Sequence, residues 1–164
     1  MKKAIVYYSM SGNTEYVAKY VSSKIDADLI KIEPKKEYPN KGLKKFLWGG
    51  KSAVMGEKPE LENYEFGNYD LIVFVSPVWA GTFAPPIRTF VNDNTDKLNG
   101  NKFAVIMCQS GAGGEKAIEK LKSLLNTEKL EQELVLIDPK DKKSEEKDKK
   151  IYEFCENIKQ KKSL

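Results

Sequence analysis

The sequence of 164 residues contains no histidine and two cysteines, Cys108 and Cys155, which lie far apart in the chain. Without histidine the protein lacks the commonest metal ligand and the usual general base of enzyme catalysis. The cysteines form no Cys-x-x-Cys motif, so buried and reduced thiols are expected rather than a redox dithiol or a zinc knuckle. We therefore predict no metal site and no catalytic side chains, and a bound cofactor would have to carry any redox or enzymatic chemistry.

The chain also lacks a long apolar run and a targeting segment. No stretch approaches the ~20 apolar residues that a membrane-spanning helix needs. The start, Met1-Lys2-Lys3, leads directly into an apolar run and is too short for a signal peptide. Hydrophobic residues make up 40% and charged residues 32% of the chain, which suits a soluble protein with one domain over residues 1–164. We expect a cytoplasmic protein that does not bind membranes.

Positive charge is in slight excess, with a net charge of +4 and lysines concentrated over residues 35–51 and 140–150. The second run is interleaved with acidic residues, as at the solvated start of a helix. The first run is more one-sided, but no nucleic-acid recognition motif accompanies it. We therefore expect no nucleic-acid partner.

Apolar runs recur along the chain at intervals that leave room for a helix between them. These candidate strands are Ala4–Tyr8, Leu29–Ile32, Leu71–Val75, Phe103–Cys108 and Leu134–Ile137. The amphipathic segments between and after them are Thr14–Ile25, Gly42–Met55, Pro86–Asn92, Glu115–Leu125 and Ser144–Gln160. Continuous apolar strands that alternate with helices predict a doubly wound α/β domain, with a five-stranded parallel sheet and helices on both faces.

The turn after the first strand has the composition of an anion site. It consists of Ser9, Met10, Ser11, Gly12, Asn13 and Thr14. A turn that opens a helix presents free N–H groups and the positive end of the helix dipole, and phosphate is its usual guest. The turn lacks the three glycines of a dinucleotide fingerprint and the Gly-Lys-Ser/Thr of a triphosphate loop. A monophosphate held by neutral donors remains, and the alternative is that Ser9 or Ser11 only caps the helix.

Two later segments, Ser76–Thr82 and Cys108–Gly113, also follow predicted strands. Open parallel sheets bind ligands at the carboxyl ends of their strands, so the turn and these two segments should meet at one edge of the sheet. The turn resembles the FMN-phosphate loop of the flavodoxin family, Ser/Thr-x-Ser/Thr-Gly-Asn-Thr, and the later segments match that family in kind and order. The resemblance covers essentially the whole chain and implies FMN as the cofactor and a strand order of 2-1-3-4-5. It implies that the flavin ring is held by two segments: Ser76, Pro77, Val78, Trp79, Ala80, Gly81 and Thr82, and Cys108, Gln109, Ser110, Gly111, Ala112 and Gly113.

The resemblance also suggests individual roles. Trp79 is the candidate to stack on the isoalloxazine ring, and packing alone is its alternative. The segment after Cys108 offers no aromatic for the second face of the ring, so Trp48 and Phe83 are the candidates. The backbone at Ala80-Gly81 corresponds to the region that contacts flavin N5.

Two smaller roles complete the predicted site. We expect Ser76 to reach the ribityl chain, because the resemblance places it beside the flavin. Cys108 is expected to be a small packing residue rather than a redox partner.

Two functions fit this resemblance. The first is an electron carrier that exchanges electrons with redox partner proteins. The second is a small FMN-dependent NAD(P)H oxidoreductase that passes electrons to a small-molecule acceptor such as a quinone. Carriers of the family typically have acidic surfaces, so the net charge of +4 counts against the simple carrier. We expect a monomer or a weak dimer.

Two other classes of protein fit the sequence less well. A phospho-acceptor signalling domain of the same fold needs an aspartate at the strand ends, where this chain has serines. An interaction module without a cofactor is disfavoured by the intact loops.

Overall fold

The structure is a computed structural model that describes residues 1–39 and 50–160. Five parallel strands form its sheet: β1 (Lys3–Tyr7), β2 (Asp28–Lys31), β3 (Leu71–Trp79), β5 (Lys102–Gln109) and β6 (Glu133–Ile137). They are arranged in the order β2-β1-β3-β5-β6, which is the predicted order 2-1-3-4-5 when the parallel strands are counted along the chain. A short sixth strand, β4 (Thr82–Phe83), pairs antiparallel with the end of β3 and was missed in the sequence.

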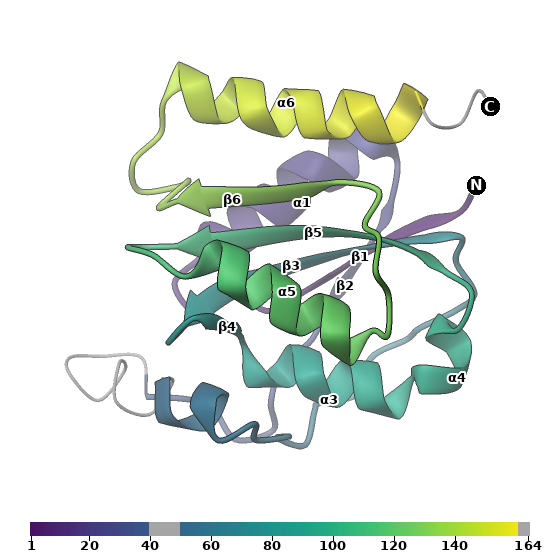
Figure 1. Ribbon diagram of the computed structural model, residues 1–164, viewed down its shortest axis with the longest axis vertical. Helices are drawn as coiled ribbons and strands as arrows, with labels where there is room; N and C mark the ends of the chain where they lie inside the picture. Colours follow the sequence, from purple (N-terminus) through teal and green to yellow (C-terminus); the bar gives the residue numbers. More distant parts are fainter. Residues whose placement is uncertain (40–49, 161–164) are drawn as a thin grey trace.

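Helices cover both faces of the sheet, as predicted (Figure 1). One face carries α1 (Asn13–Ile25) and α6 (Glu145–Gln160), and the other carries α3 (Pro85–Asp93), α4 (Thr95–Leu98) and α5 (Gly114–Leu124). The predicted boundaries agree within two residues at most ends, except that β3 extends four residues further and α4 was not predicted. Within the predicted segment Gly42–Met55, residues 50–54 are helical, and residues 42–49 lie outside the described residues.

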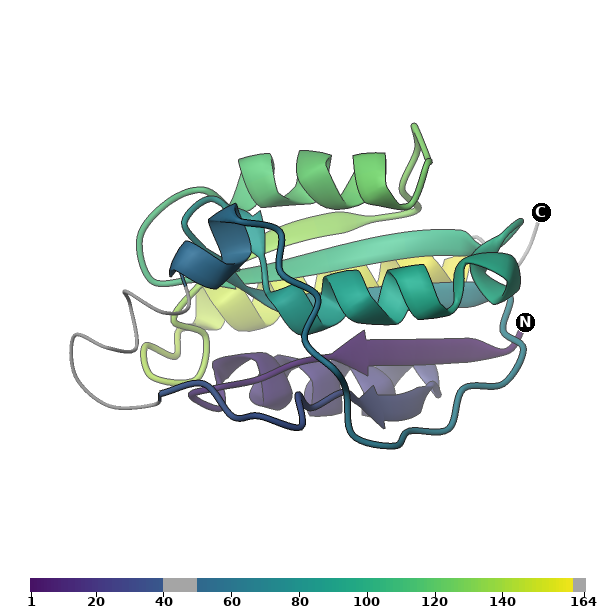
Figure 2. The ribbon, with the colours of Figure 1, turned by 90° about the horizontal axis from the view of Figure 1, so that it is seen from below.

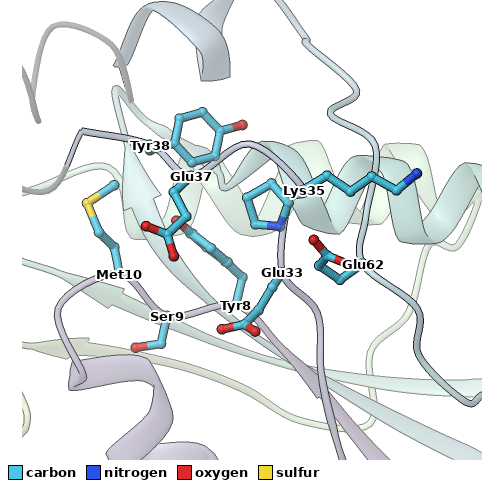
Figure 3. A pocket seen from close by; sticks show the side chains of 9 residues that line it. Tyr8, Ser9, Met10, Glu33, Lys35, Glu37, Tyr38 and Glu62 are labelled. Atoms are coloured by element: carbon cyan, nitrogen blue, oxygen red, sulfur yellow. The ribbon is translucent and has the colours of Figure 1, made fainter.

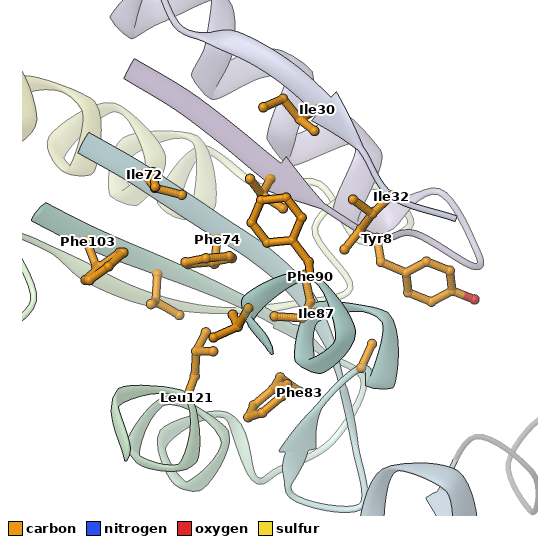
Figure 4. Packing of buried hydrophobic residues seen from close by; sticks show 14 of the residues in the cluster. Tyr8, Ile30, Ile32, Ile72, Phe74, Phe83, Ile87, Phe90, Phe103 and Leu121 are labelled. Atoms are coloured by element: carbon orange, nitrogen blue, oxygen red, sulfur yellow. The ribbon is translucent and has the colours of Figure 1, made fainter. Parts of the chain in front are cut away.

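The core consists of two apolar layers that share the sheet. Alternate residues of β3 point to opposite faces: Ile72 and Phe74 pack with α3 and α5, while Val73 and Val75 pack with α1 and α6. Figure 4 shows the first layer, where Phe74 and Phe90 are fully buried. Because both faces are covered, the central strands β1, β3 and β5 are mostly apolar, and this is why they were visible as continuous runs, whereas the edge strand β2 is mostly exposed.

Local signals set the helix starts. The Ser144 hydroxyl accepts the N–H of Lys147 at 3.3 Å, as an N-cap residue of α6 does. Helix α3 begins at Pro85, one residue before the predicted start, and proline at this position sacrifices no helical hydrogen bond.

The irregular segment over residues 56–68 runs alongside α3 (Figure 2). The Thr89 hydroxyl donates to the Pro59 carbonyl at 2.8 Å, and the Asn94 amide donates to the Tyr64 hydroxyl at 2.8 Å. These bonds hold the segment against the helix without regular structure of its own. The carboxyl ends of the parallel strands lie at the opposite edge of the sheet from the N-terminus (Figure 1).

Candidate functional site

A cavity of about 380 Å³ lies at the carboxyl edge of the sheet. All three predicted loops contribute to its lining, although the segments lie up to 100 positions apart. The predicted residues that line it are Met10, Ser11, Asn13, Thr14, Pro77, Val78, Trp79, Ala80, Cys108, Gln109, Ser110, Gly111 and Ala112. Gly50 and Asp138 also line it and were missed. Asp138 directly follows β6, so the rule that placed the other loops could have found it.

The remaining predicted residues support the lining from behind or beside it. These are Ser9, Gly12, Ser76, Gly81, Thr82 and Gly113. Ser76 is fully buried, its hydroxyl donates to the Pro77 carbonyl at 2.9 Å, and it accepts the Ala84 N–H at 2.9 Å. In this structure the Ser76 hydroxyl holds the end of β3 to the start of α3, and its contact with a ribityl chain stays a prediction.

The turn before α1 is shaped for an anion. Gly12 is the N-cap residue and has φ 92°, in the left-handed region that favours glycine. Ser9 accepts the Gly12 N–H at 3.1 Å, within the turn, and among the described side chains none caps α1. The capping alternative is therefore not what the structure contains. The N–H groups of the first helical turn remain available, next to the positive end of the helix dipole.

Asn13 ties this turn to the loop after β6. Its side-chain oxygen accepts the N–H of Lys140 at 2.8 Å, and its side-chain nitrogen donates to the Asp141 carboxylate at 2.8 Å. The bond to Lys140 joins segments that lie 127 positions apart. The position of this turn therefore depends on the loop after β6 as well as on β1.

Cys108 is a packing residue in the floor of the cavity, as expected. Its side chain is 5% exposed and belongs to the apolar layer under α1 and α6. Burial raises the pKa of the Cys108 thiol to about 12, although a hydrogen bond with the buried Thr14 side chain opposes the rise. The thiol is therefore protonated at neutral pH, and it is a poor nucleophile and a poor metal ligand.

The raised pKa of Cys108 predicts that the protein becomes less stable as the pH rises through the alkaline range. A thiol in the unfolded chain ionises near pH ~8.5, whereas Cys108 in the folded protein stays protonated to about pH 12. The stabilisation is therefore complete below the unfolded pKa and is lost as the pH rises above it. Between pH ~9 and ~11 this thiol should lower the free energy of unfolding by about 1.4 kcal/mol per pH unit.

Urea titrations of the wild type and of Cys108→Ala over this pH range measure the effect. For each pH unit, the free energy of unfolding should fall by about 1.4 kcal/mol less in the variant than in the wild type, because the other titrating groups are unchanged. Parallel pH profiles for the two proteins would show that the Cys108 thiol does not titrate differently in the folded state.

Residues 78–83 form a β-hairpin rather than the open loop expected from the sequence. Val78 pairs with Phe83, and Trp79 pairs with Thr82. The turn is the pair Ala80-Gly81, with φ 49° and 69°, as in the type I′ turns that fit two-residue hairpins. The hairpin therefore presents the Ala80 edge to the cavity from a fixed backbone.

The segment from Cys108 to Gly113, which is the second segment predicted to hold the flavin ring, packs directly on this hairpin. Gly113 has φ 102°, and a Cβ at this position would lie 2.9 Å from the Gly81 Cα. Gln109 supports the same loop, because its side-chain oxygen accepts the Gly114 N–H at the start of α5 at 2.7 Å. The two loops are thus in van der Waals contact and form one wall of the cavity.

Trp79 is held in an aromatic cluster that the sequence did not reveal. Its ring centroid lies 5.2 Å from that of Tyr38 and 5.7 Å from that of Tyr8, both edge to face. Of the two candidates for the second face of a ring, Phe83 is 1% exposed and lies under the Arg88 guanidinium, so that expectation is wrong. Trp48 lies outside the described residues.

A second cavity of about 420 Å³ adjoins the first, with Met10 lining both. Figure 3 shows Tyr8 and Tyr38 beside the carboxylates of Glu33, Glu37 and Glu62. Burial raises the pKa of Tyr38 to about 12, so its hydroxyl is neutral at physiological pH. The lining also includes Lys35, which pairs with Glu60 at 3.2 Å, so carboxylates outnumber cations in this second cavity.

Within residues 1–39 and 50–160, no cluster of three or more His, Cys, Asp or Glu side chains is arranged to hold a metal ion. The helices in those ranges are also too short or too polar to cross a membrane.

A parallel sheet of this order, with an anion-binding turn after its first strand and two further loops around one cavity, defines a doubly wound nucleotide-binding domain. The chain belongs to the flavodoxin family, whose model matches residues 2–153. The family and the fold class that the sequence indicated are both confirmed.

Solved structures show the same fold. A flavoprotein from Lactobacillus acidophilus NCFM, in complex with FMN, is 26% identical with a TM-score of 0.66, over 85% of this chain and 95% of that one. A flavodoxin from Streptococcus pneumonia TIGR4 is 19% identical with a TM-score of 0.57, over 98% and 99%. Two-electron reduced Megasphaera elsdenii flavodoxin is 14% identical with a TM-score of 0.56, over 95% and 94%. The FMN complex of the first relative supports the expected cofactor.

Proposed function

We propose that the chain works as one domain that binds FMN in the cavity at the carboxyl edge and transfers electrons between redox partners. The convergence of all three predicted loops on one cavity carries this proposal. Family membership supports it, as does the FMN complex of the Lactobacillus acidophilus relative.

Each part of the site has a proposed task. The turn over residues 9–14 holds the phosphate through the first N–H groups of α1. The hairpin with Trp79 and Ala80, and the loop from Gln109 to Gly113, hold the ring and exclude water from it. When bound, FMN supplies the redox chemistry, because no described side chain of the cavity is suited to it. The protein sets the position and the electrostatic surroundings of the flavin.

A second candidate function is an FMN-dependent NAD(P)H oxidoreductase with a quinone or similar acceptor. The net charge of +4 favours it, because carriers of this family are typically acidic. The adjoining cavity of about 420 Å³ also provides room for a small neutral acceptor beside Met10.

Titration of the purified protein with FMN tests the main proposal. We expect the visible flavin absorption to shift and its fluorescence to fall on binding, with one FMN bound per chain. Stepwise reduction with dithionite then separates the two functions, since a carrier should pass through two one-electron steps. Rapid oxidation of NADH or NADPH by the loaded protein in a stopped-flow instrument would favour the oxidoreductase. A folded protein that leaves the FMN spectrum unchanged would contradict both.

A further inference from the structure

The ammonium group of Lys140 lies against the turn that opens α1. A Cβ built on Gly12 would be 3.0 Å from Lys140 Nζ and 3.6 Å from its Cδ. The side chain therefore extends over the open face of Gly12, the N-cap residue of the helix. Lys140 belongs to the loop between β6 and α6, at the far end of the chain from this turn.

The loop that carries Lys140 is fixed in place by hydrogen bonds on both sides. Its own N–H donates to the side-chain oxygen of Asn13 at 2.8 Å, and Asn13 is 9% exposed. Upstream, the Asp138 N–H donates to the Gln109 carbonyl at 2.9 Å. The Lys142 N–H donates to the Asp138 carbonyl at 2.7 Å, so the loop also closes on itself. The backbone of Lys140 thus has a defined position relative to the cavity.

Lys140 is the uncommitted cation of this loop. Among the described residues no carboxylate pairs with its ammonium group, whereas Lys142 pairs with Asp138 at 2.7 Å. Lys143 lies over the Tyr16 ring at 4.8 Å. The nearby Asp141 carboxylate accepts from Asn13, and Glu15 in the first turn of α1 pairs with Lys19 at 3.0 Å.

Lys140 is exposed, and its ammonium group and the Asp141 carboxylate bring charges of opposite sign to the start of α1. The N-terminus of α1 carries the positive end of the helix dipole, and cations are stabilised at the opposite end. An ammonium group held beside it adds like charge to like charge. A phosphate dianion at the turn would reverse the sign of this interaction, because both the helix end and the ammonium would then attract it.

We propose that Lys140 is a phosphate-binding residue that pairs its ammonium group with the phosphate of FMN. The inference rests on the proposed function, and it changes the character of the site. The sequence predicted a phosphate held by neutral donors alone, whereas the folded chain adds a cation from the loop after β6. FMN is then distinguished from riboflavin, which lacks the phosphate, by charge as well as by hydrogen bonds.

The test compares Lys140→Gln with Lys143→Gln, which removes the same charge from the same loop but a side chain that lies on Tyr16. Dissociation constants for FMN and for riboflavin are measured by quenching of flavin fluorescence, at low and at high salt. We expect Lys140→Gln to weaken FMN binding about tenfold at low salt, as for one charge-assisted contact, and to leave riboflavin binding unchanged. Lys143→Gln should weaken FMN binding less than about threefold.

Salt gives an independent readout. The affinity of the wild type for FMN should fall as salt rises, and this dependence should be reduced in Lys140→Gln and retained in Lys140→Arg. Equal FMN affinity in the wild type and Lys140→Gln would overturn the inference and leave the proposed function intact. Weakening of FMN and riboflavin by the same factor would also overturn it. A folded wild type that binds neither flavin would overturn the proposed function and this inference together.

Discussion

Replacement of Gly113 by alanine should destabilise the protein by about 3 kcal/mol and weaken FMN binding by at least an order of magnitude. The added Cβ would lie 2.9 Å from the Gly81 Cα and 3.4 Å from the Gly81 nitrogen. Both are backbone atoms, so no side-chain rotation relieves the overlap. Gly113 also has φ 102°, where an alanine is strained even in open space. The hairpin and the loop from Gln109 to Gly113 would have to separate, and the cavity between them would change shape.

Gly100→Ala is the matched control. Gly100 also has a positive φ, 82°, but nothing lies within 4 Å of the Cβ that alanine would add. It should lose only the cost of the left-handed conformation, about 1 kcal/mol, and should bind FMN normally. Urea denaturation of both apoproteins, followed by FMN titration, separates backbone strain from steric overlap. If the two variants lose the same stability, the contact between the two loops does not hold the site together.

Removal of the Trp79 side chain should weaken FMN binding by about 2 kcal/mol, or roughly thirtyfold in the dissociation constant. Trp79 lines the cavity, and its ring is held edge to face by Tyr8 and Tyr38. A side chain held in this way loses little freedom when a ligand packs on it, so its contact area contributes to affinity. Trp79→Ala would remove that surface and one aromatic neighbour of Tyr38, which would keep Tyr8 at 6.3 Å between ring centroids.

The measurement is again flavin fluorescence, with riboflavin beside FMN. Both ligands should be weakened by a similar factor, because Trp79 acts on the ring and not on the phosphate. Trp79→Phe should recover part of the affinity. Tyr152→Ala, at a side chain that is 52% exposed on α6, controls for the loss of an aromatic far from the cavity. An unchanged affinity of Trp79→Ala for both flavins would assign Trp79 to packing alone.

Sequence patterns predicted the sheet because burial on both faces makes its central strands, β1, β3 and β5, mostly apolar. Val73 and Val75 face one layer while Ile72 and Phe74 face the other, so the run was unbroken. The hairpin after β3 was missed because Ala80-Gly81 lacks the Asn-Gly or Asp-Gly pair that signals a two-residue turn.

The candidate site was predictable where one continuous segment supplies its residues. The turn over residues 9–14 and the two ring loops each carry a local motif that can be recognised in the sequence. Lys140 and Tyr38 were missed because their roles depend on contacts between distant segments, which no local pattern encodes, whereas Asp138 directly follows β6 and the strand-end rule could have found it. Ser76 also belongs to a local motif, but contacts that the motif does not show fix its hydroxyl, which donates to the Pro77 carbonyl and accepts the Ala84 N–H on either side of the hairpin.

Because Asn13 bonds to Lys140 and Asp141, the phosphate turn is complete only once the loop after β6 has been synthesised. Residues 9–14 precede the loop that positions them by 127 positions, so they leave the ribosome before that loop is synthesised. A nascent chain that contains β1, α1 and β3 therefore has the phosphate turn but neither the brace nor the cation beside it. On the proposed function, capture of FMN at full affinity therefore requires synthesis of the loop after β6, the strand at the edge of the sheet.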